Sequence, residues 1–194
     1  MSITVRPALP RDVAAIHQIV EPYAERGILL AKELVDFYEA VQEFWVAEIA
    51  ADALGGADWA EASFPAMASP GKKPLAKPMV VGCGAIHVMW EDLAEVRTLA
   101  VAPAYVGQGI GHQLLARLLA RARELELRRV FCLTFEVDFF RSHGFTELPG
   151  PAVPEPIFGQ LLRSHDDGVA EFLELTRVKA NTLGNTRMLL RLPG

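Results

Sequence analysis

The residues best suited to chemistry lie in one glycine-rich turn near the middle of the chain. Gly107, Gly109 and Gly111 alternate with other residues and directly precede a segment whose leucines recur at helical spacing. Glycines at the start of a helix let the backbone approach a ligand closely, and the first N–H groups of the helix have no partner within it. These donors and the positive end of the helix dipole together favour phosphate. The turn therefore predicts a site for an anionic cofactor.

Three phosphate-binding patterns compete for this turn. A nucleotide-binding P-loop requires Lys and then Ser or Thr after its last glycine, whereas His112 and Gln113 follow here. The dinucleotide pattern G-x-G-x-x-G fits poorly, because the spacing is G-x-G-x-G and position 112 is histidine. The third pattern, (Arg/Gln)-x-x-G-x-(Gly/Ala), is the acyl-CoA pyrophosphate loop of the GNAT acetyltransferases, and residues 106–111 resemble it in all but the first position. Val106 stands there, which removes a side-chain contact but leaves the backbone donors in place.

Segments far from the turn extend this resemblance to nearly the whole chain. The acetyltransferase domain of N-acetylglutamate synthase is similar to the stretches GILLAKELVDFY, EFWVAE, GCGAIHV, LAEVRTLAV, RVFCLTFEVDFFRSHGFTEL and LGNTRMLLRL. More specifically, these stretches resemble the short, stand-alone bacterial form of the synthase, which lacks the amino-acid-kinase domain. The resemblance covers all but residues 50–78. It implies an acyltransferase that moves acetyl from acetyl-CoA to the α-amine of L-glutamate, or also of L-glutamine, in the first step of arginine biosynthesis.

The resemblance also implies where acetyl-CoA would bind. In the GNAT fold the sheet splays beside its fourth strand, and the pantetheine arm of CoA pairs with the backbone of that strand. The fourth strand is expected here at Glu95–Val101, with a bulge near Leu99 whose N–H groups stabilise the developing oxyanion. No metal is implied. The residues expected to contact acetyl-CoA are Leu99, Ala100, Val101, Val106, Gly107, Gln108, Gly109, Ile110, Gly111, His112, Phe139 and Phe140.

Acetyl transfer needs a base to deprotonate the substrate amine, whereas a protein acid for the departing CoA is not essential. Glu95 matches a carboxylate of the synthase family with the role of base, and the plainer alternative is a solvated glutamate at a strand end. Glu136 is the reserve candidate, although it equally suits a helix N-terminal charge. Phe140 stands where many GNAT enzymes have a tyrosine that protonates the departing CoA. Synthase-type members resemble this chain there, and thiols titrate at about 8.5, so solvent can supply that proton.

Basic side chains are expected to hold the carboxylates of the acceptor, because a buried carboxylate requires a cation or several donors. Lys32 lies in a segment where the synthases often carry two adjacent arginines. Strand alternation places Glu95, Arg97 and Leu99 on one side of the sheet. The plainer alternatives make Arg97 a surface ion-pair partner and Arg187 a solvated edge-strand charge. The expected substrate-binding residues are Lys32, Arg97, Thr134, Asn185 and Arg187.

These residues are positioned by one expected α/β (α+β) domain over residues 1–194. The GNAT resemblance implies a mixed, mostly antiparallel sheet of about seven strands, splayed at the fourth and fifth strands and flanked by helices. Prolines at 65, 70, 74 and 78 make residues 50–78 an expected low-complexity loop insertion. Strands are expected at Ile3–Arg6, Glu43–Ile49, Met79–Trp90, Glu95–Val101, Arg129–Thr134, Phe145–Leu148 and Thr186–Leu192. Helices are expected at Arg11–Glu25, Glu33–Val41, Glu136–Ser142 and Ile157–Leu175, and directly after the glycine turn.

Composition narrows the partners and the compartment. The net charge of −5 argues against nucleic acid. No apolar run is long enough to span a bilayer, and the N-terminus lacks the apolar region of a signal peptide, so a cytoplasmic protein is expected. Cys83 and Cys132 lie in apolar runs and are expected to serve packing. The expected small-molecule partners are acetyl-CoA and L-glutamate. Dimers are common among GNAT enzymes, so the resemblance is compatible with a homodimer.

Two other functions stay open at this point. One is a GNAT enzyme that acetylates another small amine or a protein α-amine. The other is of a different class, a CoA-binding regulatory module with little catalytic activity. Val106 and the missing tyrosine favour the module, whereas Glu95 and the basic candidates argue against it.

Overall fold

The computed structural model describes residues 2–50, 78–149, 153, 155–161, 163 and 184–193. Most of the expected loop at 50–78 and most of the expected helix Ile157–Leu175 lie outside these residues. Within the described part, seven strands form one sheet in the order β1-β2-β3-β4-β5-β7-β6. The pairs are antiparallel except β4 with β5, which is parallel. The expected mixed sheet is confirmed.

The elements follow the expected order along the chain. The strands are β1 (Ile3–Pro7), β2 (Phe44–Ile49), β3 (Met79–Trp90), β4 (Leu93–Val101), β5 (Arg129–Thr134), β6 (Thr146–Glu147) and β7 (Thr186–Arg191). The helices are α1 (Val13–Glu25), α2 (Leu34–Glu39), α3 (Ile110–Glu124), α4 (Val137–Ser142) and α5 (Glu155–Leu161). The described residues also form the short 3-10 turns η1 (Pro10–Asp12), η2 (Val41–Glu43) and η5 (Pro103–Tyr105).

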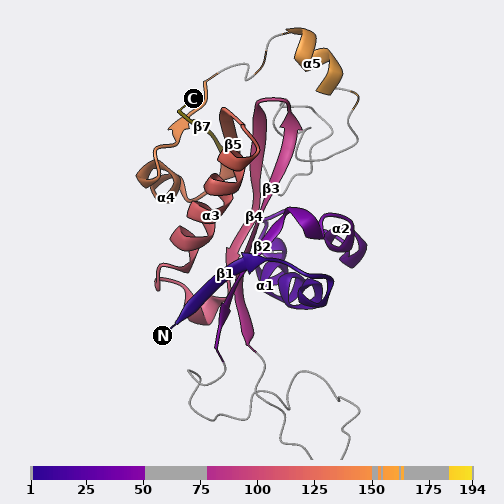
Figure 1. The fold of residues 1–194 in the computed structure, drawn as a ribbon, viewed down its shortest axis with the longest axis vertical. Coiled ribbons are helices and arrows are strands. Elements are labelled where there is room, and N and C mark those ends of the chain that lie inside the picture. Colours follow the sequence, from indigo (N-terminus) through magenta and orange to yellow (C-terminus); the bar gives the residue numbers. More distant parts are fainter. Residues whose placement is uncertain are drawn as a thin grey trace, which may run out of the picture.

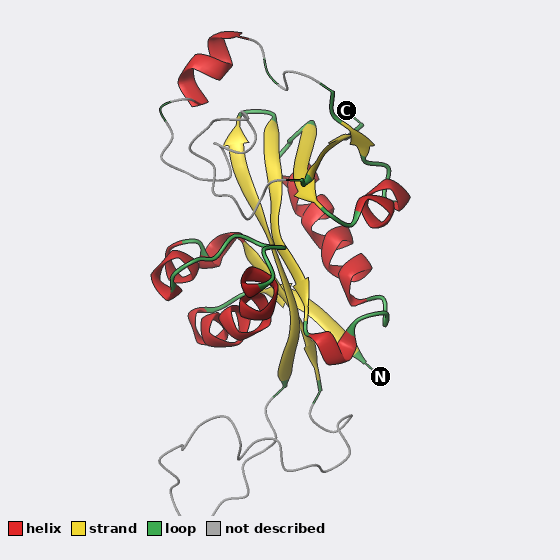
Figure 2. Cartoon of the chain, turned by 180° about the vertical axis from the view of Figure 1, so that it is seen from behind, coloured by secondary structure: helices red, strands yellow, loops and turns green. Residues whose placement is uncertain are grey.

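Helices cover both faces of the sheet. Figure 2 shows α3 on one face and the pair α1 and α2 on the other. Under α3 lies the largest apolar cluster, which includes Leu114 and Leu118 of that helix and Val96 of β4. The opposite face carries a second cluster, around Ile16 and Phe37, beneath α1 and α2. The leucine stripe of the central helix therefore faces the sheet, as its spacing predicts.

The sheet opens between β4 and β5. These two strands pair only from Leu93 to Glu95, while β5 pairs with β7 over its full length. The closed end of the opening is fixed by Asp92, whose two carboxylate oxygens each accept a hydrogen bond of 2.8 Å from the Arg129 guanidinium. Beyond Glu95 the two strands diverge (Figure 1), so the expected splay at the fourth and fifth strands is confirmed.

Most differences from the expected bounds lie at element ends. Helix α1 begins at Val13 instead of Arg11, because the preceding residues with Pro10 form a 3-10 turn. Strand β4 begins two residues early, at Leu93, where the pairing with Arg129 of β5 starts. Strand β6 is shorter than expected, and only Thr146 and Glu147 pair with β7. None of these differences moves a candidate site residue out of its element.

Candidate active site

A bulge in β4 shapes the centre of the opening. Cys83 of β3 pairs with Ala100, and Ala85 pairs with Arg97, so Thr98 and Leu99 together face the single residue Gly84. Thr98 has a φ of +52°, a left-handed conformation that is unfavourable for a β-branched residue. A bulge of this kind leaves backbone groups unpaired and redirects them. The bulge expected near Leu99 is therefore present.

The bulge overturns one prediction about side-chain direction. Strict alternation places Glu95, Arg97 and Leu99 on one face, but Leu99 packs against the apolar cluster under α3. Its Cδ1 atom lies 2.9 Å from the position that a Cβ on Gly84 would occupy. The extra residue in the bulge shifts the side-chain period by one, so Leu99 faces the side opposite to Glu95. The contribution of Leu99 to a site is thus restricted to its backbone.

The backbone of Val101 faces the opening. The N–H of Ala102 donates to the carbonyl oxygen of Val81 in β3, so the adjacent residue, Val101, directs its own polar groups to the other side. The Tyr23 hydroxyl of α1 donates to the Val101 carbonyl oxygen at 2.6 Å. Burial raises the pKa of Tyr23, and the charge of Glu136 raises it further against the lowering effect of Arg26. Tyr23 is not among the site residues that the sequence predicts.

The glycine turn presents free backbone donors at the start of α3. Gly107 and Gly109 have φ values of +82° and +76°, which glycine adopts readily, and no atom lies within 4 Å of a Cβ placed on either. The first intrahelical bond of α3 runs from Gln113 N–H to the Gly109 carbonyl oxygen. The N–H groups of residues 110–112 therefore have no partner within the helix, as an anion site requires. Val106 is 62% exposed beside them.

Aromatic rings from α4 pack beside this turn. The Phe139 ring approaches Gly111, where an added Cβ would lie 3.4 Å from a ring carbon. His112 lies next to Phe139 and shares a hydrogen bond of 2.7 Å, Nδ1 to Nε2, with His143. Burial and the neighbouring His112 lower the pKa of His143. Phe140 instead is buried in the core, edge-on to Phe145. Of the two phenylalanines, Phe139 is the one that borders the glycine turn.

A buried ion pair lies on the face of β4 that carries α1 and α2. Glu95 is only 4% exposed, and its Oε2 atom accepts a hydrogen bond of 2.6 Å from Arg97 Nε. The plainer reading of Glu95 as a solvated strand-end residue is therefore wrong. Arg97 likewise is no surface ion-pair partner, because its side chain is only 10% exposed. Glu136 is exposed at the end of β5, and its backbone N–H donates to the Thr134 hydroxyl at 2.8 Å.

A second polar pair lies beside Glu95 on the same face. His87 of β3 is directly opposite Glu95 in the antiparallel register. Its Nδ1 atom lies 2.8 Å from Oε1 of Glu43, the last residue of η2. Both side chains are partly exposed, 25% for His87 and 31% for Glu43. The sequence gives no sign of this pair, because the partner glutamate lies 44 positions away from His87.

The remaining substrate candidates come from β5, from β7 and the residue before it, and from the segment between α1 and α2. Arg187 is opposite Leu133 in the β5–β7 pairing, which places it on the face of Phe131 and hence of Glu95. Asn185 precedes β7, and its buried Oδ1 atom has no hydrogen-bond partner in the described part of the chain. Lys32 is partly exposed in the segment between α1 and α2. Thr134 is buried and bonded locally as described above. The substrate roles of all four stay predictions.

Other chemistry finds little support among the described residues. Cys83 and Cys132 are both buried free thiols, and burial raises the pKa of Cys83 to about 12, which keeps that thiol protonated. In the described ranges, no group of three or more His, Cys, Asp or Glu side chains is placed to hold a metal ion. None of the described helices is long and apolar enough to cross a membrane.

Comparison with known proteins identifies relatives over almost the full length. A profile of the Acetyltransferase (GNAT) family matches residues 29–147. An amino-acid acetyltransferase from Mycobacterium tuberculosis is 52% identical over 186 residues, which cover 96% of this chain and 92% of that protein. A crystal structure of Rv2747 from M. tuberculosis in complex with CoA and NLQ has a TM-score of 0.80 at 52% identity, over 98% of this chain and 99% of that one.

A more distant structure has the same fold. N-acetylglutamate synthase from Neisseria gonorrhoeae, complexed with coenzyme A and N-acetyl-glutamate, has a TM-score of 0.69 at 21% identity. The match covers all of this chain but only 36% of that protein. At this identity the likeness shows the fold alone.

Proposed function

The chain belongs to the acetyltransferase (GNAT) family, and we propose that it transfers acetyl from acetyl-CoA to the α-amine of L-glutamate. It is an acyltransferase, and the 52% identity to an amino-acid acetyltransferase over 96% of the chain carries the choice of an amino acid as acceptor. The geometry supports acetyl transfer from CoA, because the opening in the sheet has an anion-binding turn near it and a buried carboxylate on one face. The reaction would begin arginine biosynthesis.

Acetyl-CoA fits the opening between β4 and β5. The free N–H groups after Gly109 suit the pyrophosphate, since they supply donors without requiring a cation from Val106. The pantetheine arm would pair with the edge of β4 at Val101, where Tyr23 now holds one lone pair of the carbonyl oxygen. Backbone N–H groups at the Thr98–Leu99 bulge would stabilise negative charge on the thioester oxygen. Phe139 borders the turn on its α4 side.

Glu95 is the proposed proton acceptor for the amine. Its burial keeps water away, and Arg97 fixes one carboxylate oxygen, Oε2, so that Oε1 is available to the substrate. Because Arg97 is already bonded to Glu95, the carboxylates of glutamate fall to Lys32 and Arg187 in this proposal. Arg187 shares the face of the sheet with Glu95, which supports its part.

A second acceptor, L-glutamine, is favoured by one observation. The Asn185 Oδ1 atom is buried and lacks a partner among the described residues. A carbonyl oxygen repels a carboxylate but accepts a hydrogen bond from an amide NH2 group, which the glutamine side chain carries. Asn185 therefore favours an acceptor with an amide end over one with a second carboxylate.

The experiment is CoA-thiol release from acetyl-CoA with glutamate, glutamine and a panel of other amines. Turnover selective for glutamate or glutamine is expected. Glu95→Gln is expected to lower kcat by about 10²- to 10⁴-fold while the KM for acetyl-CoA stays within about twofold. Glu124→Gln, on the exposed end of α3, is the matched control and keeps full activity.

Other outcomes would replace the proposal. Turnover only with peptides would make the acceptor a protein α-amine. CoA binding without turnover on any amine would favour the regulatory module. A large loss in Glu136→Gln with an active Glu95→Gln variant would transfer the role of base to Glu136.

A further inference from the structure

We propose that His87, held by Glu43, is the terminal proton acceptor of the site and takes from Glu95 the proton that the substrate amine gives up. This inference rests on the proposed function, because it needs an amine that loses a proton. It adds two residues to the reacting machinery that come from β3 and η2.

The proton balance of acetyl transfer creates the need for such a group. The substrate ammonium loses two protons as its nitrogen forms a bond to the thioester carbon and the carbon–sulfur bond breaks. One proton ends on the CoA thiolate, which leaves as a thiol, and the other must reach solvent. Glu95 is 4% exposed, so a proton that it accepts has little direct access to water.

The register places His87 within reach of Glu95. Residues directly opposite in an antiparallel pair have Cβ atoms about 4.5–5.5 Å apart and lie on one face. His87 and Glu95 are such a pair, and the register is regular on both sides of them, at Ile86 and at Val88. His87 is also the more exposed of the two, at 25% of its side chain. His87 is therefore the partly exposed neighbour of the buried carboxylate, and in this proposal the proton passes between them directly or through one water.

Glu43 determines which ring nitrogen of His87 can accept a proton. An ionised carboxylate is only an acceptor, so in the 2.8 Å contact with Glu43 the hydrogen lies on Nδ1 of His87. In the neutral ring, Nε2 then carries the lone pair. Protonation of Nε2 gives an imidazolium that Glu43 stabilises by a charge-assisted hydrogen bond. The arrangement is that of a base oriented by a third group.

The ordinary basicities of imidazole and carboxylate explain why His87 would take the proton from Glu95. An ordinary imidazole is a stronger base than an ordinary glutamate carboxylate by about two pH units, so it retains a proton from an amine better near neutral pH. In the described part of the chain, the charged groups that face His87 are Glu43 from η2, and Glu95 and Arg97 from β4.

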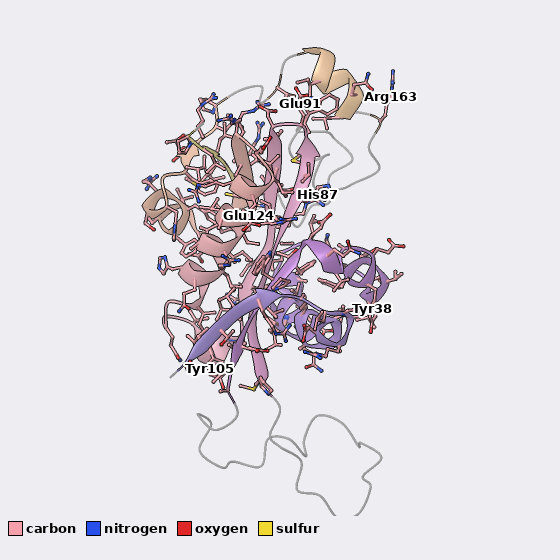
Figure 3. All side chains as sticks on the ribbon, viewed as in Figure 1. Tyr38, His87, Glu91, Tyr105, Glu124 and Arg163 are labelled. Carbon is pink, nitrogen blue, oxygen red and sulfur yellow. The ribbon has the colours of Figure 1, made fainter. Side chains whose placement is uncertain are left out.

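Figure 3 shows the place of His87 in the molecule. It lies on the central strands, above α2 and below α5 in that view, and well away from Tyr105 beside the glycine turn. The pair is therefore separate from the residues proposed to bind the phosphates of CoA. A substitution at His87 should leave the binding of acetyl-CoA unchanged.

The test compares wild type with His87→Asn and Glu43→Gln in kcat/KM for the amino acid between pH 5.5 and 9. His87→Asn keeps an amide that can bond to Glu43 but cannot titrate. We expect a loss of about 10- to 100-fold in kcat/KM, a shift of the acid limb of the profile to lower pH, and a KM for acetyl-CoA within about twofold. Added imidazole should restore part of the loss. Glu43→Gln should lose about threefold to tenfold.

His17→Asn on α1 is the matched histidine control, since His17 contacts Phe37 and lies outside this cluster. A profile for His87→Asn with the wild-type shape would overturn the relay, even where the rate falls, because a structural role leaves the pH dependence in place. Wild-type protein without turnover on any amino acid would instead refute the proposed function and the relay with it. If the His87→Asn variant has the same kcat/KM and the same pH profile as an active wild-type enzyme, the relay is refuted and the proposed function stands.

Discussion

Replacing Gly109 by alanine separates the contribution of the glycine turn to stability from its proposed contribution to the binding of acetyl-CoA. Gly109 has a φ of +76° and is the N-terminal cap of α3, so an alanine there adopts a left-handed conformation at a cost of about 1–2 kcal/mol. A Cβ at this position meets no atom of the protein within 4 Å, so backbone strain is the whole cost in the free enzyme. The melting temperature should fall by about 2–4 °C per kcal/mol.

Gly109→Ala should weaken the binding of acetyl-CoA more than it destabilises the fold. The new methyl group projects into the open space from which a pyrophosphate would approach the N–H groups of α3. Displacement of the ligand from one or two of these donors costs about 1.4 kcal/mol or more, which raises the KM for acetyl-CoA about tenfold. Steady-state kinetics with acetyl-CoA as the varied substrate measures this, beside thermal unfolding of the same sample.

Gly27→Ala supplies the matched control. Gly27 follows α1 with a φ of +68°, so alanine there carries the same strain at a distance from the turn. It should lower the melting temperature equally and leave the KM for acetyl-CoA unchanged. Equal KM values for Gly109→Ala and wild type, with the melting temperature lowered as in Gly27→Ala, would refute the assignment of the turn to the phosphates.

Three further substitutions test the opening itself. Gly84→Ala places a methyl group 2.9 Å from Leu99 Cδ1, so it should cost about 1–3 kcal/mol in chemical denaturation and reduce kcat by disturbing the bulge. Tyr23→Phe removes the hydrogen bond to the edge of β4 and should lower the free energy of unfolding by about 1 kcal/mol. The hydrogen bond from Arg129 lowers the pKa of Asp92, so this pair stabilises the fold above the unfolded value of about 3.9 and loses that effect as the pH falls. Asp92→Asn should therefore be less stable than wild type at pH 7, by under about 1 kcal/mol, and this difference should disappear as the pH falls through the lowered pKa of Asp92.

Local signals predicted most of the individual elements, whereas the mixed, splayed sheet was implied by the family resemblance. The period of Leu114 and Leu118 predicts a helix that faces the sheet, and it does. The spacing of the glycines predicts a backbone cradle, and the left-handed angles of Gly107 and Gly109 agree with it. Both features depend on residues close together in the sequence. Element ends were less accurate, because the pairing of Leu93 with Arg129 decides where β4 begins.

The parts of the site that were missed depend on contacts between distant segments. Tyr23 reaches Val101 across 78 positions, and His87 reaches Glu43 across 44. Neither contact has a motif, since a tyrosine or a histidine on an apolar element most often serves packing. The burial of Glu95 was also missed, because a charged residue at the start of a strand gives no sign of what covers it.

The bulge explains why strict alternation placed Leu99 on the wrong face of the sheet. The proposed site also requires this break in the alternation. With a regular strand, Leu99 would lie beside Arg97 on the α1 face, and the α3 face would lose an apolar contact above Gly84. One inserted residue keeps Glu95 and Arg97 on the side proposed for the amine and returns Leu99 to the core under α3. In the proposed reaction, the backbone N–H groups at Thr98–Leu99 would stabilise the thioester oxygen beside the opening, between the amine and the CoA chain. A left-handed threonine is the conformational cost of joining these two requirements in one strand.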